Sequence, residues 1–329
     1  MKCTSRRSMT AYICLFAVMV SVLTGCGGLS YDMAYNADSD ISSFNVVSGQ
    51  NTGTATPFAA NLCVVTDNVT EGTDADMTQA TAAVLFALDN NEVLYAKNVH
   101  EIRNPASLTK VMTALVALKY GSLNQQLTAT NSVNITESGA QLCGLKAGDT
   151  MTMDQALRIL LLYSANDVAM LIAEGVGGTV DHFVEMMNEE AKSLGATNTN
   201  FSNPHGLTDP NHYTTAYDLY LIFNEAMKYE TFSEIIQMNS YQTVYYDKNG
   251  KEKEFDKSTT NLFIQGRYNA PANVTVIGGK TGTTNAAGHC LMLLVRDVGG
   301  SPYISIVMGV PSTDELYNAV IDLLDEINK

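Results

Sequence analysis

Apolar residues form two kinds of pattern along the chain. Short runs rich in β-branched and aromatic residues predict strands; they lie at 61–66, 82–88, 93–96, 274–280, 290–296 and 303–308, with a hairpin turn at 89–92. Between these runs, apolar positions recur at helical spacing. Helices are expected from Pro105 onward, at 156–163, 168–174, 180–194 and 216–228, and again after 311–315. Strands and a helix at both ends, with helices between, indicate an α+β domain with a helical insertion.

A lysine lies on the apolar face of the helix that begins near Pro105. That face is defined by residues at helical spacing, Val111, Ala114, Leu115 and Leu118. Ser107 and Lys110 fit the same period and therefore share the face. An ammonium group on such a face is costly unless it is paired or gives up its proton. The position of Lys110 therefore needs a chemical explanation.

The segment 156–176 is apolar enough to suggest a membrane span. However, Arg158, Asn166 and Asp167 lie within it, which favours two core helices joined by a polar turn. The residues at 152–155, Thr-Met-Asp-Gln, match the capping box that starts a helix.

The first residues of the chain have the features of an export signal. Lys2, Arg6 and Arg7 precede an apolar run at 11–23, which is too short to span a membrane as a helix. The sequence Leu-Thr-Gly-Cys that ends at Cys26 resembles the lipobox of bacterial lipoproteins, in which the cysteine is diacylated. The alternative is an ordinary cleaved signal with an incidental cysteine.

The expected organisation has three parts. Residues 1–25 form a lipoprotein signal peptide, and two acyl chains on Cys26 would anchor the mature protein stably in the membrane. Residues 26–56 are rich in Gly, Ser, Asn and Thr and are expected to form a flexible tether. Residues 57–329 form the folded domain.

Charge and cysteine content exclude several classes of protein. The formal net charge of −15 argues against binding to nucleic acid and against electrostatic docking on anionic lipid. No CxxC or HExxH pattern occurs, so the sequence offers no metal site. Cys63, Cys143 and Cys290 are too few and too scattered for a disulfide scaffold, although two of them could still pair.

The Ser107–Lys110 pair suggests nucleophilic catalysis. Serine is a poor nucleophile and needs a base within hydrogen-bond reach, which a lysine one turn along can provide if its pKa is depressed. Pro105 is suited to a first helical turn, where the amide of Ser107 is free to hold an oxyanion. The alternative is a chance spacing in which Lys110 extends outward to solvent.

Two further motifs favour the catalytic interpretation. Ser164-Ala165-Asn166 lies at a helix junction, and Lys280-Thr281-Gly282 ends a strand. Ser-x-x-Lys, Ser-Asp-Asn and Lys-Thr-Gly are together the signature of β-lactamases and penicillin-binding proteins. A phosphate-binding loop at 278–281 is not supported, because position 274 is valine rather than glycine.

The chain resembles the serine D-alanyl-D-alanine carboxypeptidases, which are low-molecular-mass penicillin-binding proteins of peptidase family S11. PASLTKVMTAL (105–115), SANDVA (164–169), FSNPHGL (201–207) and GGKTGTTNAAGHCL (278–291) carry the resemblance, which runs from about Pro57 to the C-terminus. It implies a β-lactamase/transpeptidase-like fold, in which helices flank an antiparallel sheet and a helical subdomain is inserted.

The resemblance also assigns roles to individual residues. Ser107 would be the acylated nucleophile, Lys110 its base and Ser164 a proton relay. The substrate-binding residues would be Asn166, Lys280, Thr281, Gly282 and Thr283. Among these, Lys280 would keep Lys110 neutral, Thr281 would bind the terminal carboxylate, and the Thr283 amide would complete the oxyanion hole. Glycine at 282 leaves room for the backbone of an extended peptide to approach.

The implied activity is removal of the terminal D-alanine from peptidoglycan stem peptides during cell-wall biogenesis, with β-lactams as inhibitors. The protein would be held by its lipid on the outer face of the bacterial cytoplasmic membrane. One alternative is a β-lactamase, but Ala165 replaces the aspartate of that pattern. The other is a non-catalytic wall-binding module of the same fold.

Two other groups of residues invite different chemistry. A histidine such as His205 in a chain with a serine nucleophile suggests a Ser-His-Asp arrangement. We expect instead that His205 is a loop residue whose side chain forms a hydrogen bond to the backbone. A cluster of acidic residues is expected to be a solvated helix face rather than the source of a deacylating glutamate; it comprises Glu185, Glu189 and Glu190.

Overall fold

The computed structural model describes residue 59 and residues 61–329. The predicted signal peptide (1–25), the predicted lipidation site Cys26 and the predicted tether (26–56) lie outside the described residues. Within the described part of the chain, no helix is long and apolar enough to cross a membrane.

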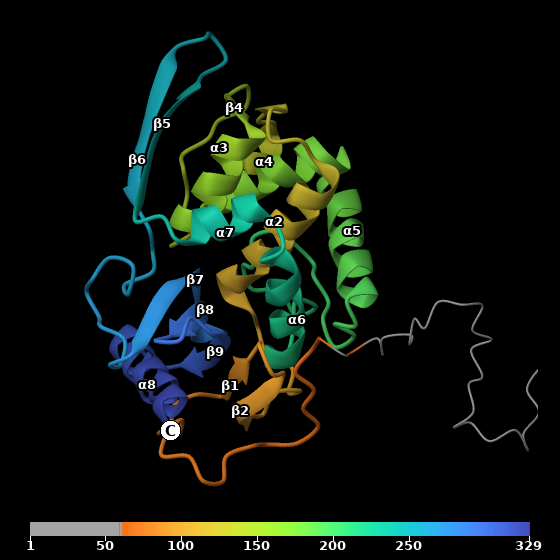
Figure 1. Ribbon diagram of the computed structural model, residues 1–329. Coiled ribbons are helices and arrows are strands. Elements are labelled where there is room, and N and C mark those ends of the chain that lie inside the picture. The colour runs from red at the N-terminus through yellow and green to blue at the C-terminus, as the bar shows by residue number, and fades with distance from the viewer. Residues whose placement is uncertain (1–58, 60) are drawn as a thin grey trace, which may run out of the picture. The chain divides into compact units, whose positions relative to one another are not determined.

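A five-stranded antiparallel sheet forms one part of the fold (Figure 1), in the order β2-β1-β9-β8-β7. Its strands are β1 (Ala82–Ala87), β2 (Glu92–Lys97), β7 (Val274–Thr284), β8 (Gly288–Asp297) and β9 (Pro302–Val310). Alternate residues of the central strands face two different cores. Ala82, Val84 and Phe86 pack with the helices α2 (Thr109–Tyr120) and α6 (Ala216–Ala226), whereas Ala83 and Leu85 pack with α8 (Thr313–Asp325). Both faces are therefore covered, and β7 is left as an edge strand beside the helical part.

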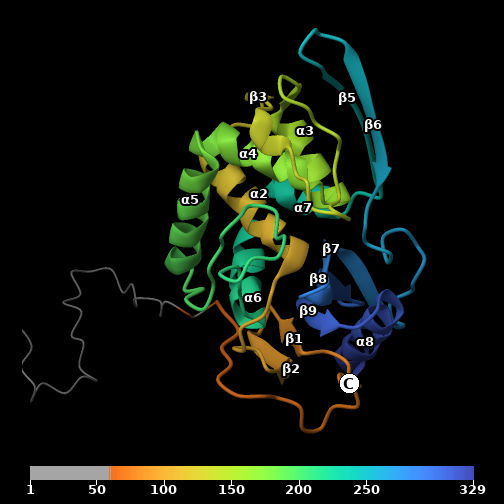
Figure 2. The same cartoon turned by 180° about the vertical axis from the view of Figure 1, so that it is seen from behind.

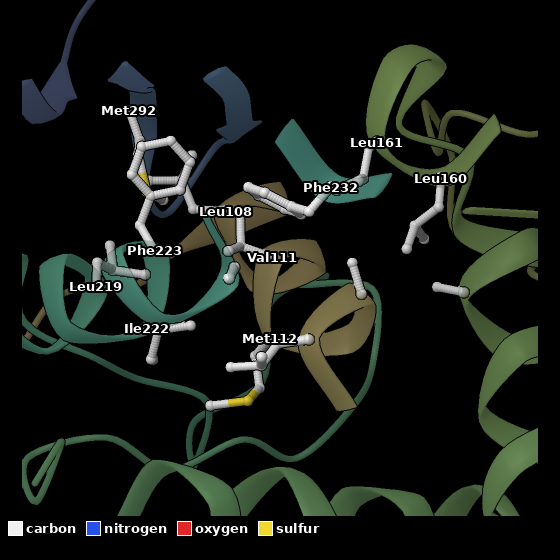
Figure 3. Packing of buried hydrophobic residues seen from close by; sticks show 14 of the residues in the cluster. Leu108, Val111, Met112, Leu160, Leu161, Leu219, Ile222, Phe223, Phe232 and Met292 are labelled. Carbon is white, nitrogen blue, oxygen red and sulfur yellow. The ribbon is translucent and has the colours of Figure 1, made fainter. Parts of the chain in front are cut away.

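The helical part lies on the other side of α2, which runs through the middle of the molecule (Figure 1). Around α2 this part consists of α3 (Met153–Arg158), α4 (Asn166–Gly177), α5 (Val180–Ser193) and α7 (Glu230–Ile236). Helices α6 and α8 pack on opposite faces of the five-stranded sheet. Figure 3 shows Leu108, Val111 and Met112 packed among side chains from other helices and from β8. The predicted capping box forms at the start of α3, where Thr152 and Gln155 bond reciprocally.

A second sheet, of order β3-β4-β5-β6, borders the helical part. It consists of β3 (Gln126–Thr128), β4 (Thr150–Thr152), β5 (Ser240–Tyr246) and β6 (Glu252–Ser258). The β5–β6 hairpin projects from the rest of the molecule, as the view from behind shows clearly (Figure 2). The sequence patterns predicted neither this hairpin nor α7.

The predicted strand at 61–66 is wrong. That segment has no ladder pairing, and side chains satisfy its backbone instead. The Tyr220 hydroxyl accepts from the Cys63 amide at 2.9 Å, and the Tyr217 hydroxyl donates to the Cys63 carbonyl at 3.1 Å. The remaining predicted strands and helices are present, with ends shifted by a few residues.

Candidate active site

The nucleophile turn begins with an unusual backbone conformation. Ala106 has a φ of +48°, a left-handed value that costs about 1–2 kcal/mol for a residue with a Cβ. Ala106 is also the first residue of a short 3-10 helix, Ala106–Leu108, which leads into α2, so Ser107 and Lys110 lie one turn apart. The Thr109 hydroxyl donates to the Ala106 carbonyl at 2.8 Å and holds this turn closed.

A buried histidine supports the same turn. His212 Nε2 lies 2.8 Å from the Thr109 hydroxyl oxygen, and its Nδ1 lies 3.1 Å from the Ser202 amide nitrogen. Since the Thr109 proton is directed at Ala106, Thr109 accepts from Nε2–H, and Nδ1 accepts from Ser202. His212 is therefore neutral, and burial lowers its pKa to about 4.

Lys110 is fully buried and has three polar neighbours. Its Nζ lies 2.8 Å from Ser107 Oγ, 2.7 Å from Asn166 Oδ1 and 2.6 Å from the His205 carbonyl oxygen. Burial holds the pKa of Lys110 well below its ordinary value, and the charge of Lys280 lowers it further, whereas Asp167 opposes the shift.

The neighbours of Lys110 determine how a neutral amine is oriented. The Asn166 and His205 oxygens can only accept, so the two hydrogens of a neutral amine point to them. The lone pair is then left for Ser107, whose hydroxyl is the one neighbour that can donate. The neutral amine of Lys110 is thus arranged to take a proton from Ser107.

The second motif follows a break in helical geometry. Residues 159–163 form a π-helix, and Ser164 ends it with a left-handed φ of +69° before α4 starts at Asn166. π-turns are frequent at functional sites. This turn between the two helices brings Ser164 Oγ to 2.9 Å from Lys280 Nζ. It also directs the Asn166 side chain to Lys110.

Lys280, Thr281, Gly282 and Thr283 lie on the edge strand β7. Lys280 is buried, and burial lowers its pKa to about 7. A Cβ on Gly282 would lie 3.1 Å from the Ser107 amide nitrogen, which shows how closely β7 passes the nucleophile turn. Thr281 Oγ1 lies 2.6 Å from the hydroxyl oxygen of Thr260, a residue that sequence patterns did not single out.

These residues line a cavity of about 510 Å³. Ser107, Ser164, Asn166, Thr281, Gly282 and Thr283 all border it, while Lys110 and Lys280 lie beneath. The sequence analysis missed other parts of the wall, among them Gln141, Thr260 and Arg267, the last being the one lysine or arginine in the lining of this cavity among the described residues. These residues belong to irregular segments without periodicity, so no sequence signal marked them.

The histidine and glutamate predictions have different outcomes. His205 is a loop residue whose Nδ1 accepts from the Leu207 amide at 3.1 Å, as predicted, and burial lowers its pKa to about 3. Glu185 and Glu189 are exposed, as predicted. For Glu190 the predicted solvated position is wrong, because its carboxylate is 3% exposed and pairs with Lys119 at 2.7 Å.

The open question about the cysteines is also answered. Cys63, Cys143 and Cys290 are all free thiols. Burial raises the pKa of Cys143 to about 12 and that of Cys290 to about 11, so both are poor nucleophiles.

Comparison with known proteins agrees with this arrangement. A sequence model of peptidase family S11, D-alanyl-D-alanine carboxypeptidase, matches residues 68–312. The chain is 34% identical over 250 residues to the D-alanyl-D-alanine carboxypeptidase DacF of Bacillus subtilis. The matched region covers 75% of this chain and 61% of DacF. It is 31% identical over 260 residues to DacC of Escherichia coli, covering 76% of this chain and 62% of DacC. The chain thus spans about three fifths of the length of these curated relatives.

Solved structures share the fold. The Streptomyces K15 DD-transpeptidase has a TM-score of 0.69 and 26% identity, covering 78% of this chain and 98% of the other. The D-alanyl-D-alanine carboxypeptidase from Mycobacterium tuberculosis H37Rv has a TM-score of 0.68 and 31% identity, covering 78% and 94%. The chain therefore has the transpeptidase fold and belongs to the D-alanyl-D-alanine carboxypeptidase family, peptidase S11.

Proposed function

We propose that the protein is a serine-type D-alanyl-D-alanine carboxypeptidase that removes the terminal D-alanine from peptidoglycan stem peptides. The observation that carries the proposal is the surrounding of Lys110, where two fixed acceptors leave the amine lone pair for the Ser107 hydroxyl. Burial and the charge of Lys280 lower the pKa of this lysine, which favours the neutral amine that a general base requires.

The proposed acylation begins at Lys110. Lys110 takes the proton of Ser107, whose Oγ forms a bond to the carbonyl carbon of the penultimate D-alanine. The amides of Ser107 and Thr283 stabilise the oxyanion. The carbon–nitrogen bond then breaks, and the leaving D-alanine receives its proton through Ser164, which restores neutral Lys110.

Deacylation repeats these steps with water as the nucleophile. Lys110 accepts a proton from water, the hydroxide oxygen bonds to the ester carbon, and the bond to Ser107 Oγ breaks. The same proton returns to Ser107, so the cycle needs no cofactor.

Substrate recognition uses the edge of β7. An extended peptide can pair with a free strand edge through main-chain hydrogen bonds. At Gly282 the missing side chain lets β7 pass close to the Ser107 turn, where a Cβ would lie 3.1 Å from the Ser107 amide nitrogen. Asn166 contacts the peptide, and Thr281, next to Thr260, binds the terminal carboxylate together with the charge of Lys280. A β-lactam presents an equivalent amide and carboxylate and acylates Ser107.

The location is a separate part of the proposal. The basic N-terminal residues, the short apolar run at 11–23 and the sequence Leu-Thr-Gly-Cys support a lipoprotein signal that ends before Cys26. The protein would be exported and held on the outer face of the bacterial cytoplasmic membrane by lipid on Cys26.

One experiment separates the candidate activities. The protein is incubated with penicillin and analysed by mass spectrometry, and D-alanine release from diacetyl-Lys-D-Ala-D-Ala is measured in parallel. A single long-lived penicilloyl adduct on the Ser107 peptide, absent in Ser107→Ala, together with D-alanine release, is the expected result. An adduct lost within seconds indicates a β-lactamase. Neither adduct nor D-alanine indicates a non-catalytic module.

The same assay addresses transpeptidation, which the name of the Streptomyces relative indicates for that protein. Adding a D-amino acid as acceptor would give a new peptide product at the expense of the hydrolysed one. The hydrolysed product is expected to remain dominant.

A further inference from the structure

One wall of the cavity is a loop that is fixed from beneath by a carboxylate. Gly139, Ala140 and Gln141 border the cavity, and the loop continues through 143–145. Asp167, the second residue of α4, is 1% exposed and lies under this loop. It is next in sequence to Asn166 but belongs to none of the three motifs.

Three successive amides of the loop donate to the Asp167 carboxylate. Oδ1 accepts from the Cys143 amide at 2.9 Å, and Oδ2 accepts from the Gly144 and Leu145 amides at 2.8 and 2.9 Å. Gly144 has a φ of +91°, and this conformation helps to turn neighbouring amides to one side. Consecutive amides arranged in this way form a concavity that binds an anion.

The loop is joined to the catalytic turn by other bonds. The Asn166 amide donates to the Gln141 carbonyl at 2.8 Å, and Gln141 Nε2 donates to the Tyr163 carbonyl at 3.1 Å. The Asn166 side chain itself accepts from Lys110. The loop, the turn that holds Ser164 and the catalytic amine are therefore one connected network.

The charges around Lys110 and Asp167 come from several elements. Lys280 on β7 faces Lys110, while His205 and His212 are neutral because their pKa values are lowered to about 3 and about 4. Asp167 is the carboxylate whose charge acts on Lys110 in the opposite sense to Lys280.

A lysine that contacts the loop from another element is already paired with a carboxylate. Lys253 of β6 lies 2.6 Å from Asp149 Oδ2 and 3.2 Å from the Gly144 carbonyl oxygen. The Cys143 thiol, also near Asp167, has a pKa raised to about 12 and is neutral.

We propose that Asp167 is a positioning residue for acylation: its buried carboxylate fastens the cavity wall to the turn that carries Asn166 and supplies a negative charge to the surroundings of Lys110. This inference rests on the proposed function. A residue that only supported the fold would not change the pH dependence of acylation. The charge and the position of the Asp167 carboxylate have different consequences for the reaction, so each can be tested by its own substitution.

The charge is tested with Asp167→Asn, which keeps the size of the side chain. The rate constant for acylation by penicillin is measured from pH 4 to 9. Without the negative charge Lys110 loses its proton more easily. The acid limb, which is the fall of the acylation rate at low pH, should therefore move to lower pH by about one unit. The maximum rate should fall about tenfold, because an amide gives the three loop amides a single acceptor oxygen.

The matched control is Asp218→Asn. Asp218 is also a buried carboxylate in the first turn of a helix, α6, and accepts from the Asn198 amide at 2.8 Å. Its charge is not among those acting on Lys110. The control should keep the wild-type acid limb even if it unfolds at a lower temperature. An Asp167→Asn enzyme with the wild-type acid limb would overturn the inference.

The position is tested with Asp167→Glu, which keeps the charge and lengthens the side chain by one methylene. The acid limb should stay near its wild-type position while the maximum rate falls about tenfold, and amides 143–145 should exchange with deuterium faster. A wild-type rate in this variant would contradict the inference, also if Asp167→Asn fails to fold. If wild-type protein itself is not acylated, the proposed function has failed; normal wild-type acylation with unchanged variants refutes the role of Asp167 alone.

Discussion

The Cα of Gly206 faces the carbonyl group of Ala106 so closely that a Cβ at position 206 would lie 1.9 Å from its oxygen. Gly206 also has a φ of +87°, which residues with side chains rarely adopt. The loop that provides the His205 carbonyl to Lys110 therefore packs directly on the left-handed residue before the nucleophile.

Gly206→Ala should therefore move the nucleophile turn, which a penicillin-labelling rate detects. We expect the rate to fall at least about 100-fold, because a displacement of about 1 Å at a reacting group has this effect. Gly250→Ala is the matched control: Gly250 has a φ of +77° but nothing within 4 Å of an added Cβ. A Gly206→Ala enzyme that labels as fast as Gly250→Ala would contradict the packing argument.

Replacing Lys110, the proposed base, should separate the effect of its charge from that of its basicity. Lys110→Arg keeps a cation but cannot lose its proton in the working range, so acylation should fall about 100-fold or more. Lys119→Arg, on the same helix and paired with Glu190, controls for the substitution itself and should react normally. Near-normal acylation by Lys110→Arg would remove this lysine from the mechanism.

The acylation rate should depend on pH in a bell shape. The acid limb reflects Lys110, which must be neutral and whose pKa is well below its ordinary value. If Lys280 must stay protonated, the rate should fall on the alkaline side as pH rises through its pKa of about 7. Lys280→Arg stays charged at all these pH values, so its alkaline limb should disappear even though its maximum rate is lower. An alkaline limb that is the same in both proteins would show that another group causes it.

Folding stability should decrease in mild acid because of the buried histidines. The pKa of His205 is lowered to about 3 and that of His212 to about 4, both below the ordinary value of 6.5. The unfolded chain therefore binds protons first, and stability present above about pH 6.5 is lost as pH falls toward 4. For His212 the loss is on the order of a few kcal/mol.

Unfolding in urea at pH 7.5 and pH 5 measures this effect. His212→Gln should be less stable at pH 7.5 but should lose less on going to pH 5 than the wild type does. The exposed His182 provides the control, and His182→Gln should lose as much as wild type. Equal losses in all three proteins would assign the acid sensitivity to other groups.

Lipidation is checked by metabolic labelling with a fatty acid. Cys26→Ser removes the acceptor thiol, so the label should disappear and the processing or release of the precursor should change. Cys63→Ser should keep the label. Equal label on wild type and Cys26→Ser would refute the lipoprotein proposal.

The sequence predicted those parts of the fold and site that depend on local spacing. Ser107 and Lys110 meet because they are one helical turn apart, and the apolar runs at 274–280 and 290–296 lie within paired strands β7 and β8. The contact of Lys110 with the His205 carbonyl joins residues 95 positions apart and uses a main-chain atom, which carries no residue-specific signal.

Other features had no usable pattern. Strand β6 has seven residues, of which Phe255 alone is buried, so it shows no apolar alternation. The left-handed conformations of Ala106 and Ser164 occur at residues that rarely adopt them, and tertiary packing rather than local preference imposes them. Thr260 contacts Thr281 from the segment that follows the β5–β6 hairpin. Its place in the site therefore depends on a hairpin that the sequence patterns did not predict.

The three contacts of Lys110 have a consequence for how the enzyme is switched on. In the ammonium form, Lys110 donates its third hydrogen to Ser107 Oγ and cannot accept the serine proton. In the amine form, the Ser107 hydroxyl donates to the lone pair of Lys110. The two forms differ in the direction of one hydrogen bond and require no movement of heavy atoms. Crystals grown on either side of the pKa of Lys110 should therefore give superimposable X-ray structures, and neutron diffraction would distinguish the resting enzyme from the reactive one.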